Sequence, residues 1–198
     1  EMRERTGVQT CALPICMKIA VGWTVKRRGI VVGMLVGALT LGSAAPHGLV
    51  LIGGADWRLT VFLASLLAFV AAGLIMFARL GPYHATAARF DPSVLWLAWR
   101  LPKVRLAYAG YFCHMWELYA FWAWIAAALT ASLNLSGVDD PIKVARITTF
   151  ISISFGGLLC VFAGVLADKI GKAIVAGGAM AISGGLAIAT AISFGGPP

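Results

Sequence analysis

The chain has 198 residues, of which 60% are hydrophobic and 12% are charged, and its mean hydropathy is +0.88. These values exclude an ordinary soluble domain and predict an all-α integral membrane protein. The net charge of +8 would suit a nucleic-acid-binding protein, but the basic residues are dispersed between apolar stretches, so we expect no nucleic-acid partner.

Residues 1–15 read EMRERTGVQTCALPI and have no initiator methionine at position 1. The run at 6–15 resembles the translation of a common sequencing-library adapter. We therefore expect residues 1–15 to be an adapter artefact, and the fold to be encoded from about residue 16 onward.

Five apolar windows follow along the chain. They are residues 30–53, 59–78, 106–133, 147–167 and 173–194, and none contains Lys, Arg or Asp. A helix that crosses a bilayer needs about 20 mostly apolar residues. The windows therefore predict five transmembrane helices with the lipid bilayer as a partner, and their length excludes the short alternating strands of a membrane β-barrel.

The basic residues fall mainly in alternate connections between these windows. One side of the membrane would hold Lys18, Lys26, Arg27, Arg28, Arg79, Arg89, Arg100, Lys103, Arg105, Lys169 and Lys172, and the other only Arg58, Lys143 and Arg146. Cytoplasmic loops carry the excess of Lys and Arg. The pattern predicts a multi-pass protein of the cell (plasma or inner) membrane with its N-terminal end in the cytoplasm.

The window 106–133 is the best candidate for a functional site, because it carries His114 and Glu117 near its middle. An acidic group at mid-depth costs about 3 kcal/mol on insertion scales, which several Leu, Ile and Phe residues offset at about 0.3–0.6 kcal/mol each. Residues three apart share a helix face. We therefore expect Glu117 to face protein or water rather than lipid, beside His114.

The other polar features predict no cofactor, metal or catalytic residue. Cys113 and Cys160 lie inside separate windows, as small apolar side chains do, and no zinc-ligand spacing is present. The connection 134–146 is expected to be an external loop with Asp139 and Asp140, and residues 168–172 to be a tight cytoplasmic turn.

Residues 164–172, GVLADKIGK, resemble the cytoplasmic signature of the major facilitator superfamily, G-x-L-a-D-[RK]-x-G-[RK]. Gly164, Asp168, Gly171 and Lys172 match it, whereas Ala173 replaces the usual second basic residue. The resemblance implies a gating loop. In it the glycines permit a sharp turn and close packing, and the Asp caps a helix end and pairs with basic groups of a neighbouring helix.

The resemblance also implies a place for each segment in a partial major-facilitator-type bundle, from about helix five to helix nine. Residues 16–78 would end the N-terminal six-helix half, 79–105 would be the central cytoplasmic loop, and 106–198 would begin the C-terminal half. Helices missing from both ends of the same polypeptide would complete the bundle. One departure is Ala45 before Pro46, where the antiporter motif of the family has Gly-Pro.

The function implied is that of a secondary transporter, not an enzyme, which carries a small-molecule solute by alternating access, with a proton as a candidate coupling ion. Glu117 and His114 are the first candidates for binding solute or proton, and Tyr111 is the next. Trp116 and Tyr119 are further candidates to line the site. Two alternatives stay open. One is an intramembrane enzyme that uses His114 and Glu117 for metal or acid–base chemistry, and the other is a non-transporting scaffold protein or a non-functional membrane fragment.

Overall fold

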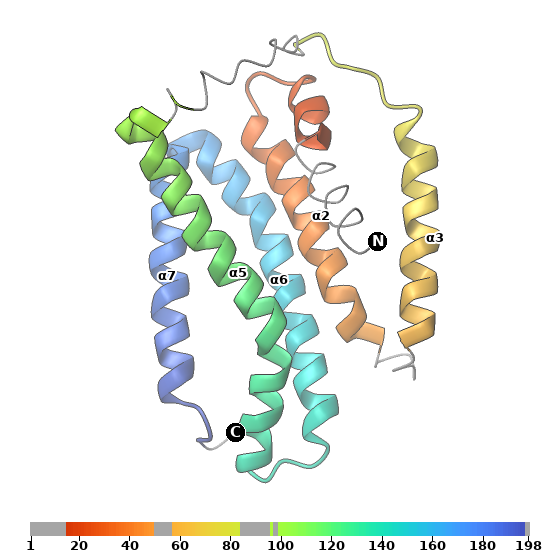
Figure 1. Cartoon of the computed structure of the whole chain (residues 1–198), viewed down its shortest axis with the longest axis vertical. Helices are drawn as coiled ribbons and strands as arrows, with labels where there is room; N and C mark the ends of the chain where they lie inside the picture. Colours follow the sequence, from red (N-terminus) through yellow and green to blue (C-terminus); the bar gives the residue numbers. More distant parts are fainter. Residues whose placement is uncertain (1–14, 50–56, 84–95, 97–98, 197–198) are drawn as a thin grey trace. The chain divides into compact units, whose positions relative to one another are not determined.

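The computed structural model describes residues 15–49, 57–83, 96 and 99–196, and within these residues the protein is helical without strands (Figure 1). The major helices are α2 (Arg28–Gly48), α3 (Trp57–Ile75), α5 (Pro102–Leu135), α6 (Pro141–Ile170) and α7 (Lys172–Ile192). Among the described residues, these five are long and apolar enough to cross a membrane. For the described residues, the prediction of an all-α protein with about five helices of membrane-spanning length and composition is confirmed.

The expected loop at 134–146 is wrong in its extent. Helix α6 begins at Pro141, so Lys143 and Arg146 lie in the helix, and the connection to α5 is only residues 136–140. Proline at the first helical position is pre-organised for a helix start, and α5 likewise begins at a proline, Pro102. A prediction from apolar windows leaves out these polar first turns, because each helix begins several residues before its hydrophobic stretch.

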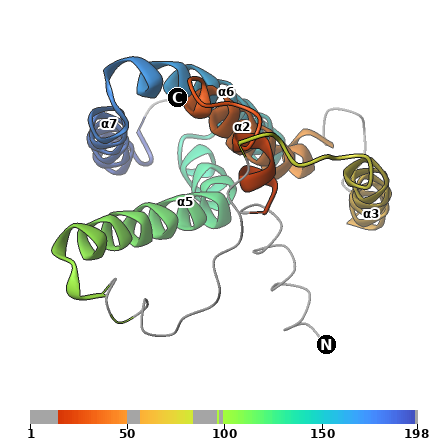
Figure 2. The ribbon, with the colours of Figure 1, turned by 90° about the horizontal axis from the view of Figure 1, so that it is seen from above.

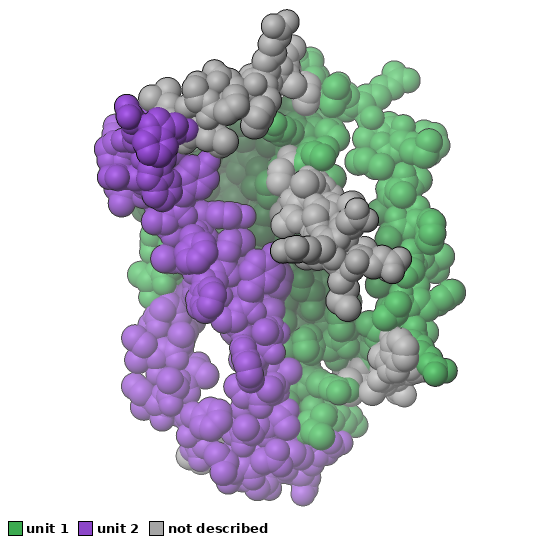
Figure 3. Space-filling model, viewed as in Figure 1, with its two compact units in different colours: residues 1–85, 142–181 green, residues 86–141, 182–198 purple. Residues whose placement is uncertain are grey.

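The chain forms two compact units, which Figure 3 shows in different colours. Unit 1 comprises residues 1–85 and 142–181, and unit 2 comprises residues 86–141 and 182–198. The adapter-like residues 1–14, and residues 84–95 and 97–98 of the predicted central loop, lie outside the described part of the chain.

The core of unit 1 is the contact between α2 and α6, which lie side by side in two perpendicular views (Figures 1 and 2). Gly33 faces the carbonyl of Cys160, and Gly37 faces that of Gly157. Near the end of α2, Gly48 meets the ring of Phe150. Residue numbers rise along α2 as they fall along α6, so the two helices are antiparallel.

Small residues allow this close approach. A Cβ atom added to Gly33 would lie 2.5 Å from the Cys160 carbonyl oxygen, and one added to Gly37 would lie 2.6 Å from that of Gly157. The buried residues of α2 are Gly33, Gly37 and Ala44. Close van der Waals contact between the two backbones therefore helps to hold this pair, as is common between membrane helices.

The large apolar side chains are mostly exposed. Neither α5 nor α7 has a buried residue, and Phe69 of α3, for example, is 78% exposed. Transfer of apolar surface into water costs about 25 cal/mol per Å². Such helices are suited to an apolar surrounding, either lipid or further helices.

In unit 2, α5 and the second half of α7 are joined by polar contacts. Near their ends, Ser136 Oγ donates a hydrogen bond to the Gly196 carbonyl at 2.6 Å, and Gly195 N–H donates to Ser132 Oγ at 3.0 Å. A further contact, Ser183 to Glu117, lies earlier in both helices. The two segments therefore run in the same direction.

Candidate functional site

The predicted pair of His114 and Glu117 lies on one face of α5. His114 Nδ1 is 3.7 Å from Glu117 Oε2, an ion pair when the imidazole is protonated. The two side chains are 48% and 38% exposed. Both groups can therefore be reached from outside unit 2.

A third residue, Ser183 of α7, completes this cluster. Its hydroxyl donates a hydrogen bond to Glu117 Oε1. Sequence reasoning missed Ser183, although it is one of the few hydroxyl residues within the apolar window 173–194. Thr190, another of them, donates instead to the Leu186 carbonyl of its own helix at 2.9 Å, so a hydroxyl in such a window does not by itself identify a partner.

The cluster can hold a proton or a cation. One carboxylate oxygen of Glu117 accepts the Ser183 hydrogen bond, and the other faces the His114 ring. An ionised carboxylate accepts several hydrogen bonds through its two oxygens, and a protonated one can donate. Glu117 therefore retains capacity for a further ligand in either state.

Tyr111 lies one helical turn before His114 on α5. It is 63% exposed and lines a groove of about 650 Å³ on unit 2. The residues around this groove belong to α5 or directly precede it: Trp99, Arg105, Tyr108, Ala109, Tyr111, Phe112 and Met115. The structure thus groups Glu117 with His114 and Ser183, and Tyr111 with an aromatic groove.

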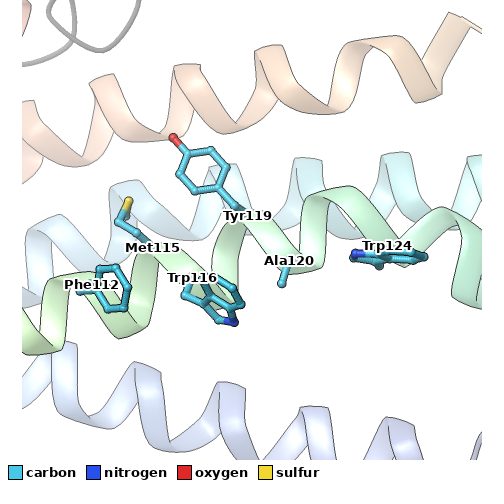
Figure 4. Close-up of a pocket in the computed structure, with 6 residues that line it drawn as sticks. All are labelled: Phe112, Met115, Trp116, Tyr119, Ala120 and Trp124. Atoms are coloured by element: carbon cyan, nitrogen blue, oxygen red, sulfur yellow. The ribbon is translucent and has the colours of Figure 1, made fainter. Parts of the chain in front are cut away.

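A second, smaller groove of about 430 Å³ continues along α5 (Figure 4). Trp116 and Tyr119 line it, together with Phe112, Met115, Ala120 and Trp124. The Tyr119 ring also packs edge-to-face against Trp122, with centroids 5.7 Å apart. These aromatic candidates therefore form an apolar surface that includes neither His114 nor Glu117.

The predicted gating loop is a single-residue turn between α6 and α7. Gly171 has φ +102°, and its N–H donates to the Ala167 carbonyl at 3.2 Å. Only glycine adopts such a φ without steric cost. Gly171 thus ends α6, and Lys172 is the first residue of α7.

Asp168, one turn before this glycine, caps the N-terminus of α2. Asp168 Oδ1 accepts a hydrogen bond from Gly29 N–H at 2.9 Å, and Oδ2 accepts one from Ile30 N–H at 3.2 Å. The residue at the N-cap position, Arg27, makes no side-chain cap. The amides at the second and third helical positions are those that a local cap would satisfy, so a residue of α6 replaces the missing local cap.

Gly164 belongs to the same contact. Its carbonyl oxygen and the Asp168 carboxylate both lie where a side chain on Gly29 would project. The resemblance also implied a basic partner for Asp168, but no ion pair joins Asp168 to any residue in the described ranges. The interaction seen is with the positive end of the α2 helix dipole.

Within the described residues, no group of three or more His, Cys, Asp or Glu side chains is placed to hold a metal ion. No protein family, no curated protein and no solved structure matches this chain.

Proposed function

We propose that the chain is part of a secondary transporter of the major-facilitator type, which carries a small solute across a cell membrane by alternating access. The observation that carries this proposal is the cluster of Glu117, His114 and Ser183 on membrane-length helices. Ionisable groups within such helices are costly and commonly mark ion or solute pathways. Glu117 would bind the solute or a coupling proton, and the His114 imidazole, 3.7 Å from the carboxylate, would share that proton.

The capped turn supports the same proposal. Asp168 bonds to α2 only while the ends of α2 and α6 stay together. Alternating access requires helix ends to separate on one side of the membrane while they close on the other. In this proposal the Asp168 cap is part of the cytoplasmic gate, with Gly164, Gly171 and Lys172 shaping the turn.

In a transporter of this type, the five helices would be the fifth to ninth of twelve, with α2 and α3 ending one six-helix half and α5 beginning the other. The complete gene would then encode four helices before α2 and three after α7. It would also encode another copy of the signature turn early in the polypeptide. A gene without these features would argue against the assignment.

The decisive test is uptake by the complete transporter in proteoliposomes, with radiolabelled small organic acids and cations outside and a pH-sensitive dye inside. Glu117→Gln should abolish uptake or uncouple it from proton entry, because the amide cannot carry the carboxylate charge. Asp139→Asn is the matched control, since Asp139 is an exposed acid in the connection between α5 and α6. Uptake and proton entry unchanged in Glu117→Gln would refute the proposed role of this site.

A further inference from the structure

The groove that contains Tyr111 has a positively charged residue, Arg105, in its lining near the start of α5. Lys103 and Arg100 are close to Arg105 in sequence. None of the three has an ion-pair partner within the described ranges. The first turn of α5 has no acidic residue, and its N-cap residue, Leu101, provides no side-chain cap.

This arrangement favours an anion. The N-terminus of a helix carries a partial positive charge, and here basic side chains add to it. The nearest acidic residues along the chain are Asp91 and Glu117. An anion at this end of α5 would be attracted by the helix dipole and by the basic side chains together.

The rest of the groove is apolar and has the length of one bilayer leaflet. From Arg105 to Met115, α5 rises about 15 Å, which is half of the roughly 30 Å hydrocarbon core. Tyr108 and Trp99 lie near the charged end, and Trp and Tyr are enriched where a helix meets the lipid headgroups.

We propose that this groove binds an anionic phospholipid. The headgroup phosphate would contact Arg105, and an acyl chain would lie along Tyr108, Phe112 and Met115. The positive charge of Arg105 favours an anionic headgroup. The apolar length of the groove favours a lipid over a free anion. This inference rests on the proposed membrane insertion, but not on transport or on any role of Glu117.

The test uses the full chain in phosphatidylcholine vesicles that contain increasing fractions of brominated phosphatidylglycerol or brominated phosphatidylcholine. Bromine quenches tryptophan fluorescence at short range, so the chain keeps Trp99, which lines the groove, and carries phenylalanine at its six other tryptophan positions. Brominated phosphatidylglycerol should quench the tryptophan fluorescence more strongly than brominated phosphatidylcholine does at the same fraction. Arg105→Gln should lower this preference about fivefold, because a basic group near an anionic surface contributes about that factor.

Two matched controls separate a groove from general surface attraction. Arg27→Gln removes one exposed positive charge outside the groove, and it should leave the preference almost unchanged. Ala109→Phe fills the groove, whereas Ala107→Phe adds the same side chain at an exposed position that does not line it. Only Ala109→Phe should reduce the binding of phosphatidylglycerol.

Several outcomes would overturn the proposal. These are equal quenching by the two lipids, equal losses in Arg105→Gln and Arg27→Gln, no effect of Ala109→Phe, or displacement by millimolar inorganic phosphate. Alkaline extraction of the vesicles checks that each variant is inserted. A wild-type chain that is extracted would refute membrane insertion and this proposal with it, whereas a chain that binds the lipid without transporting would refute only the proposed function.

Discussion

The carboxylate of Asp168 accepts hydrogen bonds from two amides of α2 that no local side chain caps. Loss of an N-cap acceptor typically lowers stability by about 1 kcal/mol. We therefore expect Asp168→Ala to lower the free energy of unfolding in detergent by about that amount, and Asp168→Asn to lower it less, since the amide oxygen still accepts one bond.

Circular dichroism during denaturant titration measures this change, with Asp139→Asn as the control. Equal stability of Asp168→Ala and the wild type would show that water satisfies the two α2 amides as well as the carboxylate does.

Ser183 provides a second test at the scale of single residues. Ser183→Ala removes the hydrogen bond to Glu117, so it should reduce uptake severalfold, and Ser183→Thr should restore most of it. Thr190→Ala deletes a hydroxyl that bonds only within α7, and it should transport normally. Initial uptake rates in proteoliposomes give the comparison; equal rates in Ser183→Ala and Thr190→Ala would remove Ser183 from the site.

The sequence was sufficient to predict the pairing of His114 with Glu117, because the spacing within one helix fixes which side chains are neighbours. It did not predict Ser183 or the aromatic groove that Tyr111 lines. A partner on another helix depends on the axial register and rotation of that helix. Apolar composition does not specify either.

At the scale of helices, glycine position decides how closely α2 and α6 approach. A methyl group on Gly33 would meet the Cys160 carbonyl, whereas one on Gly42 of the same helix would meet nothing within 4 Å. Gly33→Ala should destabilise the protein by about 1–3 kcal/mol through overpacking. Gly42→Ala should instead stabilise it by about 0.5–1 kcal/mol, because alanine favours the helix.

The two substitutions should change the free energy of unfolding in opposite directions. Denaturant titration in detergent measures both changes. Destabilisation of similar size in both would mean that the backbones of α2 and α6 are not in contact at Gly33.

The five helices were predictable because each contains an apolar stretch of bilayer length. Their first turns were not predictable, because these are polar. In α6, Lys143 and Arg146 follow the helix-starting Pro141, so the helix begins before its hydrophobic stretch does. Glycine recurs every four residues at 29, 33 and 37, a spacing that puts the three on one helix face, but this spacing does not identify α6 as the partner.

At the scale of the whole molecule, the alternating charge pattern predicts which connections share a membrane side. The connection containing Val138 and the turn after Lys169 lie at opposite ends of α6. This helix has 30 residues and so rises about 45 Å, enough to separate its ends across a bilayer.

In a variant without its native cysteines, Val138→Cys should react with an impermeant maleimide added to intact cells. Lys169→Cys should react only after the membrane is permeabilised. Labelling of both cysteines in intact cells would contradict the proposed topology.

The division into two compact units was not predictable from the order of the helices. Unit 1 joins α2 to α6, and α7 contributes to both units. Hydropathy identifies segments that leave water, but contacts between them depend on the small residues that each presents, such as Gly37 and Gly157.

The long-range cap on α2 also has a consequence for biogenesis. Gly29 and Asp168 are separated by 139 positions, and at about 5–20 residues per second a ribosome needs on the order of 10 s to synthesise that interval. During this delay the start of α2 must rely on water, headgroups or an insertion chaperone for its free amides. The nascent helix would therefore acquire its final anchor only when the α6 segment leaves the translocon.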